Sequence, residues 1–466
     1  MHHKIFSQIV KEIIQFRESS STNRVGISAS YEELCSCVNR DLPDIGETSE
    51  KALNTLVSSV KNALIHNVNP RYYGFVIGGS TPVSIAADWL TSGWDQNGQV
   101  YNTSPAAAII EDVVTEWILK LLELPEKASI GYVTGAQMAN FVGLSIARNS
   151  VLSDYLWDID TKGLQNAPHI NIICGECCHG TIHSGIRMMG LGTENVKTVP
   201  NDREGRILIK ELHSTILDCE GPTILCLQAG NVNTGAFDNF EEAIDFAHLK
   251  KVWVHVDGAF GLWARATTKY RLLTAGVQKA DSWSVDAHKW LNVPYDSGMV
   301  IVRNSDEHKR LKTTRCAYAG ESDEKLRDGS VWVPENSRRA RAFVLYATLR
   351  NMGRKGVELL IEKSCELAKQ FEMEIKNIPS TRILNDVVLN QVLFRIEPQS
   401  VADLDSFNKA VADRIQNSGV CWIGSTIWEG LTALRISVSN YSTSANDVSM
   451  SIDSLKTAID EEVALA

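Results

Sequence analysis

The chain has 466 residues, of which 44% are hydrophobic and 22% charged, a balance that fits globular domains with a sizeable core and not a disordered segment. At about 150 residues per domain, this length predicts about three domains or one large domain with attachments. The 46 Lys and Arg residues against 56 Asp and Glu give a formal charge of −10, and no basic run stands out. A nucleic-acid partner is therefore not expected.

The first stretch of the chain is expected to form an amphipathic helix. Ile5, Ile9, Ile13 and Phe16 recur on one helical face, and Lys4 interrupts the apolar core that a secretory signal needs. No apolar stretch reaches the ~18 residues of a membrane-spanning helix, so no membrane partner is expected. The ten cysteines are spread along a long chain, which favours reduced thiols and a cytoplasmic location.

Helix-like and strand-like stretches alternate from Ser104 through the third quarter of the chain. Ser104 and Pro105 are typical of the start of a helix, and Pro125 of its end. Short apolar strands are expected at 130–134, 170–174, 223–228, 252–256, 282–285 and 299–302. This alternation predicts an α/β fold with a mostly parallel central sheet, helices on both faces, and ligands at the carboxyl ends of the strands.

The pattern changes beyond Arg350, where a long helix, a strand pair around 387–396, a helix over 401–417 and a strand near 434–439 are expected. We therefore expect an N-terminal helical segment over 1–85, a large α/β domain over 86–335 and a small C-terminal α+β domain over 336–466. The polar, aperiodic stretch 319–337 is expected to be a loop that is mobile or covers a site.

An aspartate and a lysine follow two of the expected strands. Asp257 ends the stretch VWVHVD, and Lys289 lies in SVDAHKW after the next strand. An amine that attacks a carbonyl, beside a carboxylate that keeps a ring nitrogen protonated, is the pair that pyridoxal 5′-phosphate (PLP) requires. By themselves, these residues could also be a solvated surface lysine and a turn carboxylate.

A phosphate site and a ring-stacking residue would complete such a cofactor site. Gly135 lies at a strand-to-helix turn, where the amides of Ala136 and Gln137 would face an anion at the start of the helix. His179 follows the strand at 170–174 and could lie over a pyridine ring. The alternative for His179 is a helix cap or a buried, hydrogen-bonded histidine.

Nine motifs in chain order carry a resemblance to a known family. They are NPRYYGF (69–75), NTSPAAAIIEDVVTEW (102–117), VTGAQMAN (133–140), the segment around His179, AGNVNTGAFD (229–238), HVDGAFG (255–261), DAHKWLNVPYDSG (286–298), PENSRRARAFVLYATLR (334–350) and ALRISVSN (433–440). Together they resemble the group II PLP-dependent amino acid decarboxylases of fold type I, which include aromatic amino acid and glutamate decarboxylases. The resemblance extends over most of the chain.

The resemblance implies a PLP-dependent transferase fold of type I, with the cofactor bound by the domain over 86–335. It implies that Lys289 is the Schiff-base lysine and that Asp257 pairs with the pyridine nitrogen. Ala259 would pack under the ring and His179 above it. The resemblance further implies cofactor contacts from Ala136, Gln137, Asn231 and His288.

The resemblance also suggests residues that act on the substrate. Tyr318 matches the place of a loop tyrosine that donates a proton to Cα, the alternatives being an exposed loop tyrosine and a proton from water. Arg435 would face the substrate carboxylate or form a structural ion pair. Apart from the resemblance, an aromatic wall at the substrate could be formed by Tyr72, Tyr73, Phe75, Trp89 and Trp94, of which Tyr73 and Phe75 are the candidate substrate contacts. The alternative is packing in the core or at a dimer interface.

This chain departs from the family pattern at two places. Gln137 stands where many fold type I enzymes have Ser or Thr, so a hydroxyl contact with phosphate is not expected there. Residues 76–79 read Val, Ile, Gly and Gly, where the aromatic amino acid members carry more aromatic residues. These departures affect the prediction of the substrate more than the prediction of the cofactor-binding residues.

The function implied is decarboxylation of an L-amino acid to the amine and carbon dioxide, through an internal aldimine on Lys289, by a homodimer. A related PLP enzyme, either an aminotransferase or an amine-oxidising aldehyde synthase, would share the cofactor contacts. A non-catalytic or zinc-stabilised binding protein is the alternative from another class.

A zinc site is the competing interpretation of the segment CGECCHGTIH. This segment holds Cys174, Cys177, Cys178, His179 and His183, with a C-x-x-C pair. A structural zinc site normally needs a second ligand pair at matching spacing, and the sequence shows none. We therefore expect no metal, and Cys174 also fits as an ordinary apolar strand residue.

Overall fold

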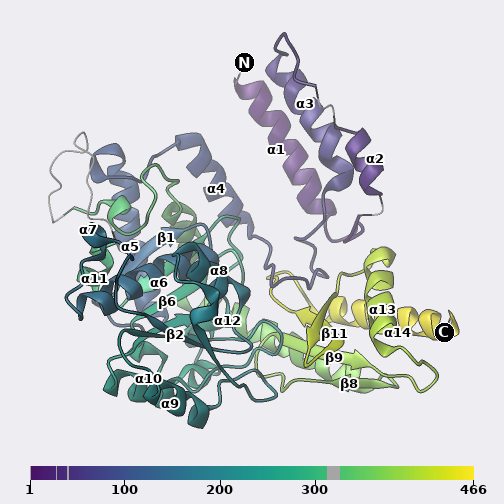
Figure 1. The fold of residues 1–466 in the computed structure, drawn as a ribbon. Helices are drawn as coiled ribbons and strands as arrows, with labels where there is room; N and C mark the ends of the chain where they lie inside the picture. Colours follow the sequence, from purple (N-terminus) through teal and green to yellow (C-terminus); the bar gives the residue numbers. More distant parts are fainter. Residues whose placement is uncertain (1, 28, 39–40, 312–325, 466) are drawn as a thin grey trace. The chain divides into compact units, whose positions relative to one another are not determined.

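The computed structural model describes residues 2–27, 29–38, 41–311 and 326–465, which form two compact units (Figure 1). The first unit comprises Met1–Ile77, Lys369–Leu384 and Leu393–Ala466, and the second comprises Gly78–Ala368 and Asn385–Val392. The N-terminal helices therefore group with the C-terminal strands, while the division into 1–85, 86–335 and 336–466 stays a prediction. No helix in the described ranges is both long enough and apolar enough to cross a membrane.

The second unit is built around a seven-stranded sheet. Its strands are β1 (Ser129–Val133), β2 (Asn171–Gly175), β3 (Val196–Val199), β4 (Thr223–Gln228), β5 (Trp253–Asp257), β6 (Ser282–Asp286) and β7 (Gly298–Val302). Their order across the sheet is β1-β7-β6-β5-β4-β2-β3, and only β7 runs antiparallel to its neighbours. The predicted mostly parallel sheet is confirmed.

Continuous burial explains why most of these strands were visible in the sequence. Every residue of β1, β2, β6 and β7 is buried, as expected for strands covered on both faces. The strand β3 was missed, because it is a short edge strand in which only Val199 is buried. Its sequence therefore has no apolar run.

Helices cover both faces of this sheet. The helices of the second unit are α4 (Pro82–Trp94), α5 (Pro105–Leu121), α6 (Ala136–Ser153), α7 (Ile159–Lys162), α8 (Gly180–Met188), α9 (Ile209–Leu217), α10 (Phe240–Leu249), α11 (Ser305–Lys309) and most of α12 (Ala342–Lys376). The predicted caps of α5 hold, since the Ser104 side chain accepts from the Ala107 amide and Pro105 is the first helical residue.

The helix α6 lies along the middle of the sheet. Its Val142 and Ile146 pack with Val133 of β1 and Val300 of β7. On another side, Leu144 of α6 joins a core that includes residues of β2, β4 and α8. This packing holds the first residue of α6, Ala136, at the edge of the sheet where β1 ends.

The parallel strands bring their carboxyl ends to that same edge. Asp257 is the last residue of β5, and Asp286 is the last residue of β6. The register places Asp257 opposite Ser284 of β6, and Gly298, the first residue of β7, opposite both Asp286 and Val133. In open α/β sheets this is the edge at which ligands bind.

The first unit contains a four-stranded sheet in the order β10-β11-β9-β8. These strands are β8 (Thr381–Ile383), β9 (Gln391–Ile396), β10 (Gly424–Trp428) and β11 (Leu431–Ser437), and the helices of this unit are α1 (His2–Ser19), α2 (Tyr31–Ser36), α3 (Ser49–Val60), α13 (Leu404–Ser418) and α14 (Ala445–Leu465). The pairs β8–β9 and β10–β11 are antiparallel. The predicted small α+β region near the C-terminus is thus present.

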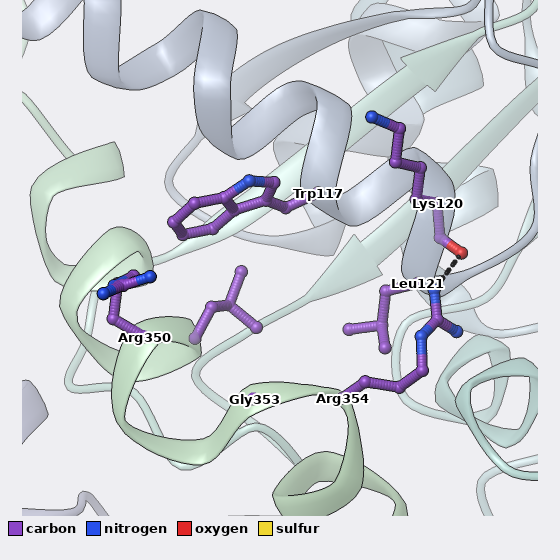
Figure 2. Close-up of a pocket in the computed structure, with 7 residues that line it drawn as sticks. Trp117, Lys120, Leu121, Arg350, Gly353 and Arg354 are labelled. Carbon is purple, nitrogen blue, oxygen red and sulfur yellow. Dashed lines mark hydrogen bonds between the residues drawn. The ribbon is translucent and has the colours of Figure 1, made fainter.

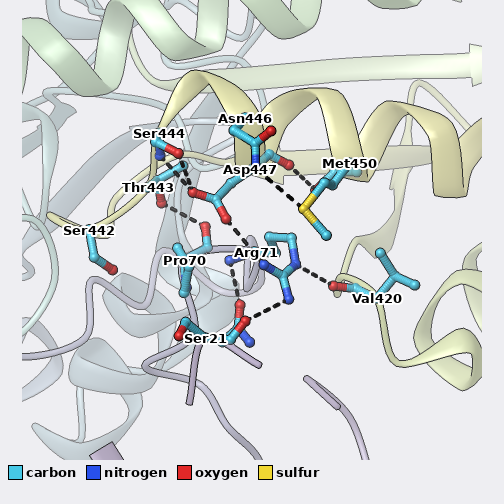
Figure 3. Close-up of polar contacts among 12 residues, drawn as sticks. Ser21, Pro70, Arg71, Val420, Ser442, Thr443, Ser444, Asn446, Asp447 and Met450 are labelled. Atoms are coloured by element: carbon cyan, nitrogen blue, oxygen red, sulfur yellow. Dashed lines mark hydrogen bonds and ion pairs between the residues drawn. The ribbon is translucent and has the colours of Figure 1, made fainter. Parts of the chain in front are cut away.

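A buried arginine joins the two ends of the chain within the first unit (Figure 3). Arg71 forms an ion pair with Asp447, with 3.2 Å between Nη1 and Oδ1. Its Nη2 donates to the Ser21 carbonyl at 3.0 Å, and its Nε donates to the Val420 carbonyl at 2.8 Å. These contacts between segments far apart in the sequence explain why the N-terminal residues belong with the C-terminal ones.

Candidate active site

The side chain of Asp286 lies between the predicted lysine and the start of α6. Its Oδ2 is 2.9 Å from Nζ of Lys289, and its Oδ1 accepts from the amide of Ala136 at 2.7 Å. Asp286 is only 1% exposed. The structure thus brings Lys289 and Ala136 to one carboxylate, which the sequence had not singled out although it opens the motif DAHKW.

Glycines allow the chain segments at the start of α6 to come close together. A Cβ atom on Gly135 would lie 2.9 Å from Cε1 of His288, and one on Gly298 would lie 2.5 Å from Cα of Gly135. Gly135 also provides no side chain to cap α6. The first amide of this helix instead donates to an anionic group from another element, the carboxylate of Asp286, and such a helix start suits an anion.

Gly78 makes a similar close approach on the other side of the lysine. A Cβ atom there would lie 1.9 Å from the carbonyl oxygen of Lys289. A larger residue would have to displace the backbone that carries the lysine. This contact explains why position 78 is a glycine in this chain, although the aromatic amino acid members of the family carry more aromatic residues over 76–79.

Three donors hold the carboxylate of Asp257. Its Oδ2 accepts from the Asn140 side-chain amide at 3.0 Å, and its Oδ1 accepts from the Ala259 amide at 3.2 Å and from the Ser284 hydroxyl at 3.3 Å. Asp257 is 8% exposed. These contacts fix the orientation of the carboxylate.

A buried histidine orients Asn140 in turn. The ring of His255 lies with Nε2 3.0 Å from Oδ1 of Asn140 and Nδ1 2.8 Å from the Ser282 hydroxyl. Burial lowers the pKa of His255 to about 4, against the opposing effect of the Asp257 charge, so the ring is neutral near pH 7. Because the amide nitrogen of Asn140 donates to Asp257, the hydrogen-bond pattern assigns the ring proton to Nε2.

The same network reaches His179 through Thr181. His179 is the N-cap of α8, and its Nδ1 accepts from the Thr181 amide at 3.3 Å and lies 2.9 Å from the Thr181 hydroxyl. Asn140 donates to that hydroxyl at 3.1 Å. His179 therefore caps a helix, as one of the two alternatives predicted. The residue is exposed, and its stacking on the cofactor ring stays a prediction.

The remaining predicted cofactor residues lie around this edge. The Ala259 carbonyl accepts from the Asp286 amide at 2.8 Å. Nδ1 of His288 accepts from the Ser297 amide at 3.2 Å, and burial lowers the pKa of His288. Gln137 is exposed in the first turn of α6. The cofactor contacts predicted for these residues remain predictions.

Asn231 has a different environment. Its Oδ1 accepts from the amides of Asn233 and Thr234, and its Nδ2 donates to the Cys177 carbonyl at 3.3 Å. These bonds shape the loop after β4 and tie it to the loop after β2. A cofactor contact from Asn231 stays a prediction.

The contacts of the predicted substrate residues with a substrate stay predictions. Tyr73, Phe75 and Arg435 belong to the first unit, and Tyr318 lies outside the described residues. Tyr73 is 1% exposed, with its hydroxyl 3.2 Å from that of Ser451. Arg435 lies on β11 opposite Gly424, and burial lowers its pKa to about 10.

A separate basic pocket lies between α5 and α12 (Figure 2). It is lined by Trp117, Lys120, Leu121, Leu349, Arg350, Gly353 and Arg354. Arg354 donates to the Lys120 carbonyl at 2.8 Å. None of the predicted site residues lines this pocket, so the chemistry belongs to the edge of the sheet.

The residues at the sheet edge fit PLP by their chemistry. The cofactor offers a ring nitrogen, an aldehyde and a phosphate. This edge provides a carboxylate in Asp257, an amine in Lys289 and a helix start at Ala136, whose amide binds the carboxylate of Asp286. The sequence had identified these three. It had missed Asp286, Asn140, Thr181 and His255, whose roles depend on contacts across the fold.

Comparison with known proteins agrees with this assignment. The pyridoxal-dependent decarboxylase conserved domain matches residues 32–397, and the chain belongs to that family. An aromatic-L-amino-acid decarboxylase from Bacillus atrophaeus is 25% identical over 98% of this chain and 95% of its own. An acidic amino acid decarboxylase from Homo sapiens is 25% identical over 85% of this chain and 77% of its own.

Solved structures show the same fold. The crystal structure of Oryza sativa TDC with PLP and tryptamine has a TM-score of 0.91, covers 98% of this chain and 97% of its own, and is 21% identical. Mouse CSAD has a TM-score of 0.90 at 23% identity, with 98% and 97% coverage. The predicted fold is confirmed, and the chain is a PLP-dependent amino acid decarboxylase, a carboxy-lyase.

Proposed function

We propose that this chain converts an L-amino acid to the amine and carbon dioxide with Lys289 and Asp257 as its catalytic residues. The observation that carries the proposal is the position of Asp286, whose two oxygens bind Nζ of Lys289 and the amide of Ala136. The amine and the helix start thereby lie together at the edge where β5 ends in Asp257.

Each residue at this edge has a distinct task in the proposal. Lys289 would hold the cofactor through its aldehyde, at the position that the amino group of the substrate would take during the reaction. The amides of Ala136 and Gln137, with His288, bind the phosphate. His179 and Ala259 pack against the two faces of the ring, and Asn231 shapes the loop beside it.

Asp257 would keep the pyridine nitrogen protonated, and its three hydrogen-bond donors hold the carboxylate in a fixed orientation for that contact. When bound, PLP supplies an electron sink for the bond that breaks to carbon dioxide. The residues around it must hold that bond in a reactive orientation and exclude water.

The substrate contacts and the final proton come from elsewhere in the chain. We propose Tyr73, Phe75 and Arg435 as substrate contacts and Tyr318, or a water molecule, as the donor of the proton to Cα. The named relatives act on aromatic and on acidic amino acids, so either side chain is a candidate for this chain. A homodimer in the cytoplasm completes the proposal and is tested by sedimentation and cell fractionation.

Incubation with a panel of L-amino acids tests the reaction directly. Equal amounts of carbon dioxide and amine are expected from one class of substrate. The specific alternative to an amine product is an aldehyde, because a phenylacetaldehyde synthase from Arabidopsis thaliana is 24% identical to this chain. Aldehyde with ammonia, or keto acid without carbon dioxide, would identify an aldehyde synthase or an aminotransferase instead.

A further inference from the structure

Two cysteines and a histidine that have no task in the proposed reaction lie together beside β2 and α8. Cys174 is a buried residue of β2, Cys178 lies in the following turn, and His183 lies in α8. Sγ of Cys178 is 3.3 Å from Sγ of Cys174 and 3.3 Å from Nε2 of His183. All three atoms lie within 4.8 Å of one another.

These distances are close to those of a zinc coordination shell. With Zn–S of about 2.3 Å and Zn–N of about 2.0–2.1 Å, tetrahedral geometry places two sulfurs about 3.8 Å apart and a sulfur and a nitrogen about 3.6 Å apart. The two distances from Cys178, 3.3 Å each, would need to lengthen by about half an ångström or less to receive the ion. Two thiolates and an imidazole are also a donor set that borderline-soft divalent cations prefer.

Negative charge near the cluster favours a cation. The carboxylates of Asp257 and Asp238 both interact electrostatically with Cys178. Their negative potential would stabilise a bound dication.

We propose that Cys174, Cys178 and His183 form a binding site for one Zn²⁺ ion. The two thiols lose their protons on binding, so that two thiolates balance the two charges of the ion. The residues described by the structure supply three ligands, which leaves the fourth tetrahedral position to water. The C-x-x-C pair in the sequence pointed to Cys177. The fold selects Cys178 instead, because it is the sulfur of Cys178 that lies 3.3 Å from that of Cys174.

The position of the site links it to the cofactor edge. Cys178 directly precedes His179, which caps α8, and Thr181 of the same helix is bound to the Asn140 that holds Asp257. A metal ion that joins β2 to α8 would fix the segment that carries His179. Metal occupancy is therefore expected to raise the melting temperature of the protein.

Titration of the reduced holoenzyme with Cd²⁺ tests the proposal. Cadmium replaces zinc at thiolate sites and gives an ultraviolet thiolate-to-metal charge-transfer band that imidazoles, including those of His2 and His3, do not give. One Cd²⁺ per chain is expected, displaced by Zn²⁺. Cys178→Ser and His183→Gln should each weaken binding at least about 100-fold, since even loss of an outer hydrogen-bond partner costs 10–100-fold.

Cys177→Ser is the matched control, because Cys177 is the neighbouring cysteine but not a member of the cluster. It should bind Cd²⁺ like the wild type. Melting curves without metal check that each variant folds. If Cys178→Ser does not fold, His183→Gln provides the test. Absence of a charge-transfer band, or a band retained in the ligand variants or lost only in Cys177→Ser, would overturn the assignment.

Discussion

Lys289 and Asp286 form an ion pair in the turn after β6, with 2.9 Å between Nζ and Oδ2. The other oxygen of Asp286 accepts a hydrogen bond from the Ala136 amide, and we propose that this amide donates to the phosphate of the cofactor. Asp286 and a phosphate group would therefore compete for this amide.

Asp286→Asn should consequently tighten PLP binding, by about tenfold. The amide has the size of the carboxylate but lacks the charge that repels a phosphate dianion, and a tenfold change needs only ~1.4 kcal/mol. Spectroscopic titration of the cofactor-free variant with PLP measures the dissociation constant, with inorganic phosphate as a competitor. Weaker binding would mean that Asp286 supports the phosphate site and does not compete for it.

Borohydride reduction should fix the cofactor on Lys289. The purified protein is expected to be yellow, and reduction should convert the reversible attachment into a stable bond that peptide mapping locates. Lys289→Ala should remove the label and the activity while leaving the fold intact. A label on another lysine in the wild-type protein would refute the central residue assignment.

Asp257→Asn should bind the cofactor and lose activity by at least about 100-fold. The phosphate site does not involve this side chain, whereas an amide cannot stabilise a protonated ring nitrogen as a carboxylate does. Turnover and cofactor affinity are measured on the same preparation. Ser284→Ala is a milder comparison, because it removes one donor to Asp257 and keeps the charge. Full activity in Asp257→Asn would show that the electron sink works without it.

His255 should make the free energy of unfolding depend on pH. Its pKa is lowered by burial from 6.5 to about 4 in the folded protein, so its contribution is complete above pH 6.5 and is lost as pH falls towards 4, by about 3 kcal/mol in total. The lowered pKa of buried His308 acts in the same direction. Burial raises the pKa of Asp238 to about 6, so this group has the opposite effect and stabilises the folded protein as pH falls below 6.

His255→Gln isolates this contribution, because glutamine can still donate to Asn140 and does not titrate. On acidification, the free energy of unfolding of the variant should fall less steeply than that of the wild type. The two slopes should differ by up to about 1.4 kcal/mol per pH unit. Urea unfolding at several pH values between about 7 and 4.5 measures both slopes. Equal slopes would show that another group causes the acid sensitivity.

Tyr318→Phe should separate loss of carbon dioxide from formation of the amine. The substitution keeps the ring and removes the hydroxyl that we propose as the proton donor. Carbon dioxide should still be released, while amine formation slows and oxygen diverts part of the product to aldehyde with ammonia. Unchanged rates and products would assign the proton to water or to another group.

The sequence by itself determined the fold class, the cofactor and the class of reaction. Strands such as β1 and β6 are buried along their whole length, so their apolar runs are continuous and visible without a structure. Asp257 and Lys289 follow such strands directly, and parallel strands bring their carboxyl ends to one edge. Local sequence was therefore sufficient to place both residues at the ligand-binding edge.

Tertiary structure alone decided what holds these residues in place. Asn140 and Asp257 are 117 residues apart, and Ala136 and Asp286 are 150 residues apart, yet each pair is joined by a hydrogen bond. No local pattern marks such partners, because a side-chain hydrogen bond depends on the packing of α6 against the sheet. The same reason explains why Cys178, and not Cys177, lies beside Cys174: the turn between β2 and α8 sets which sulfur points towards it.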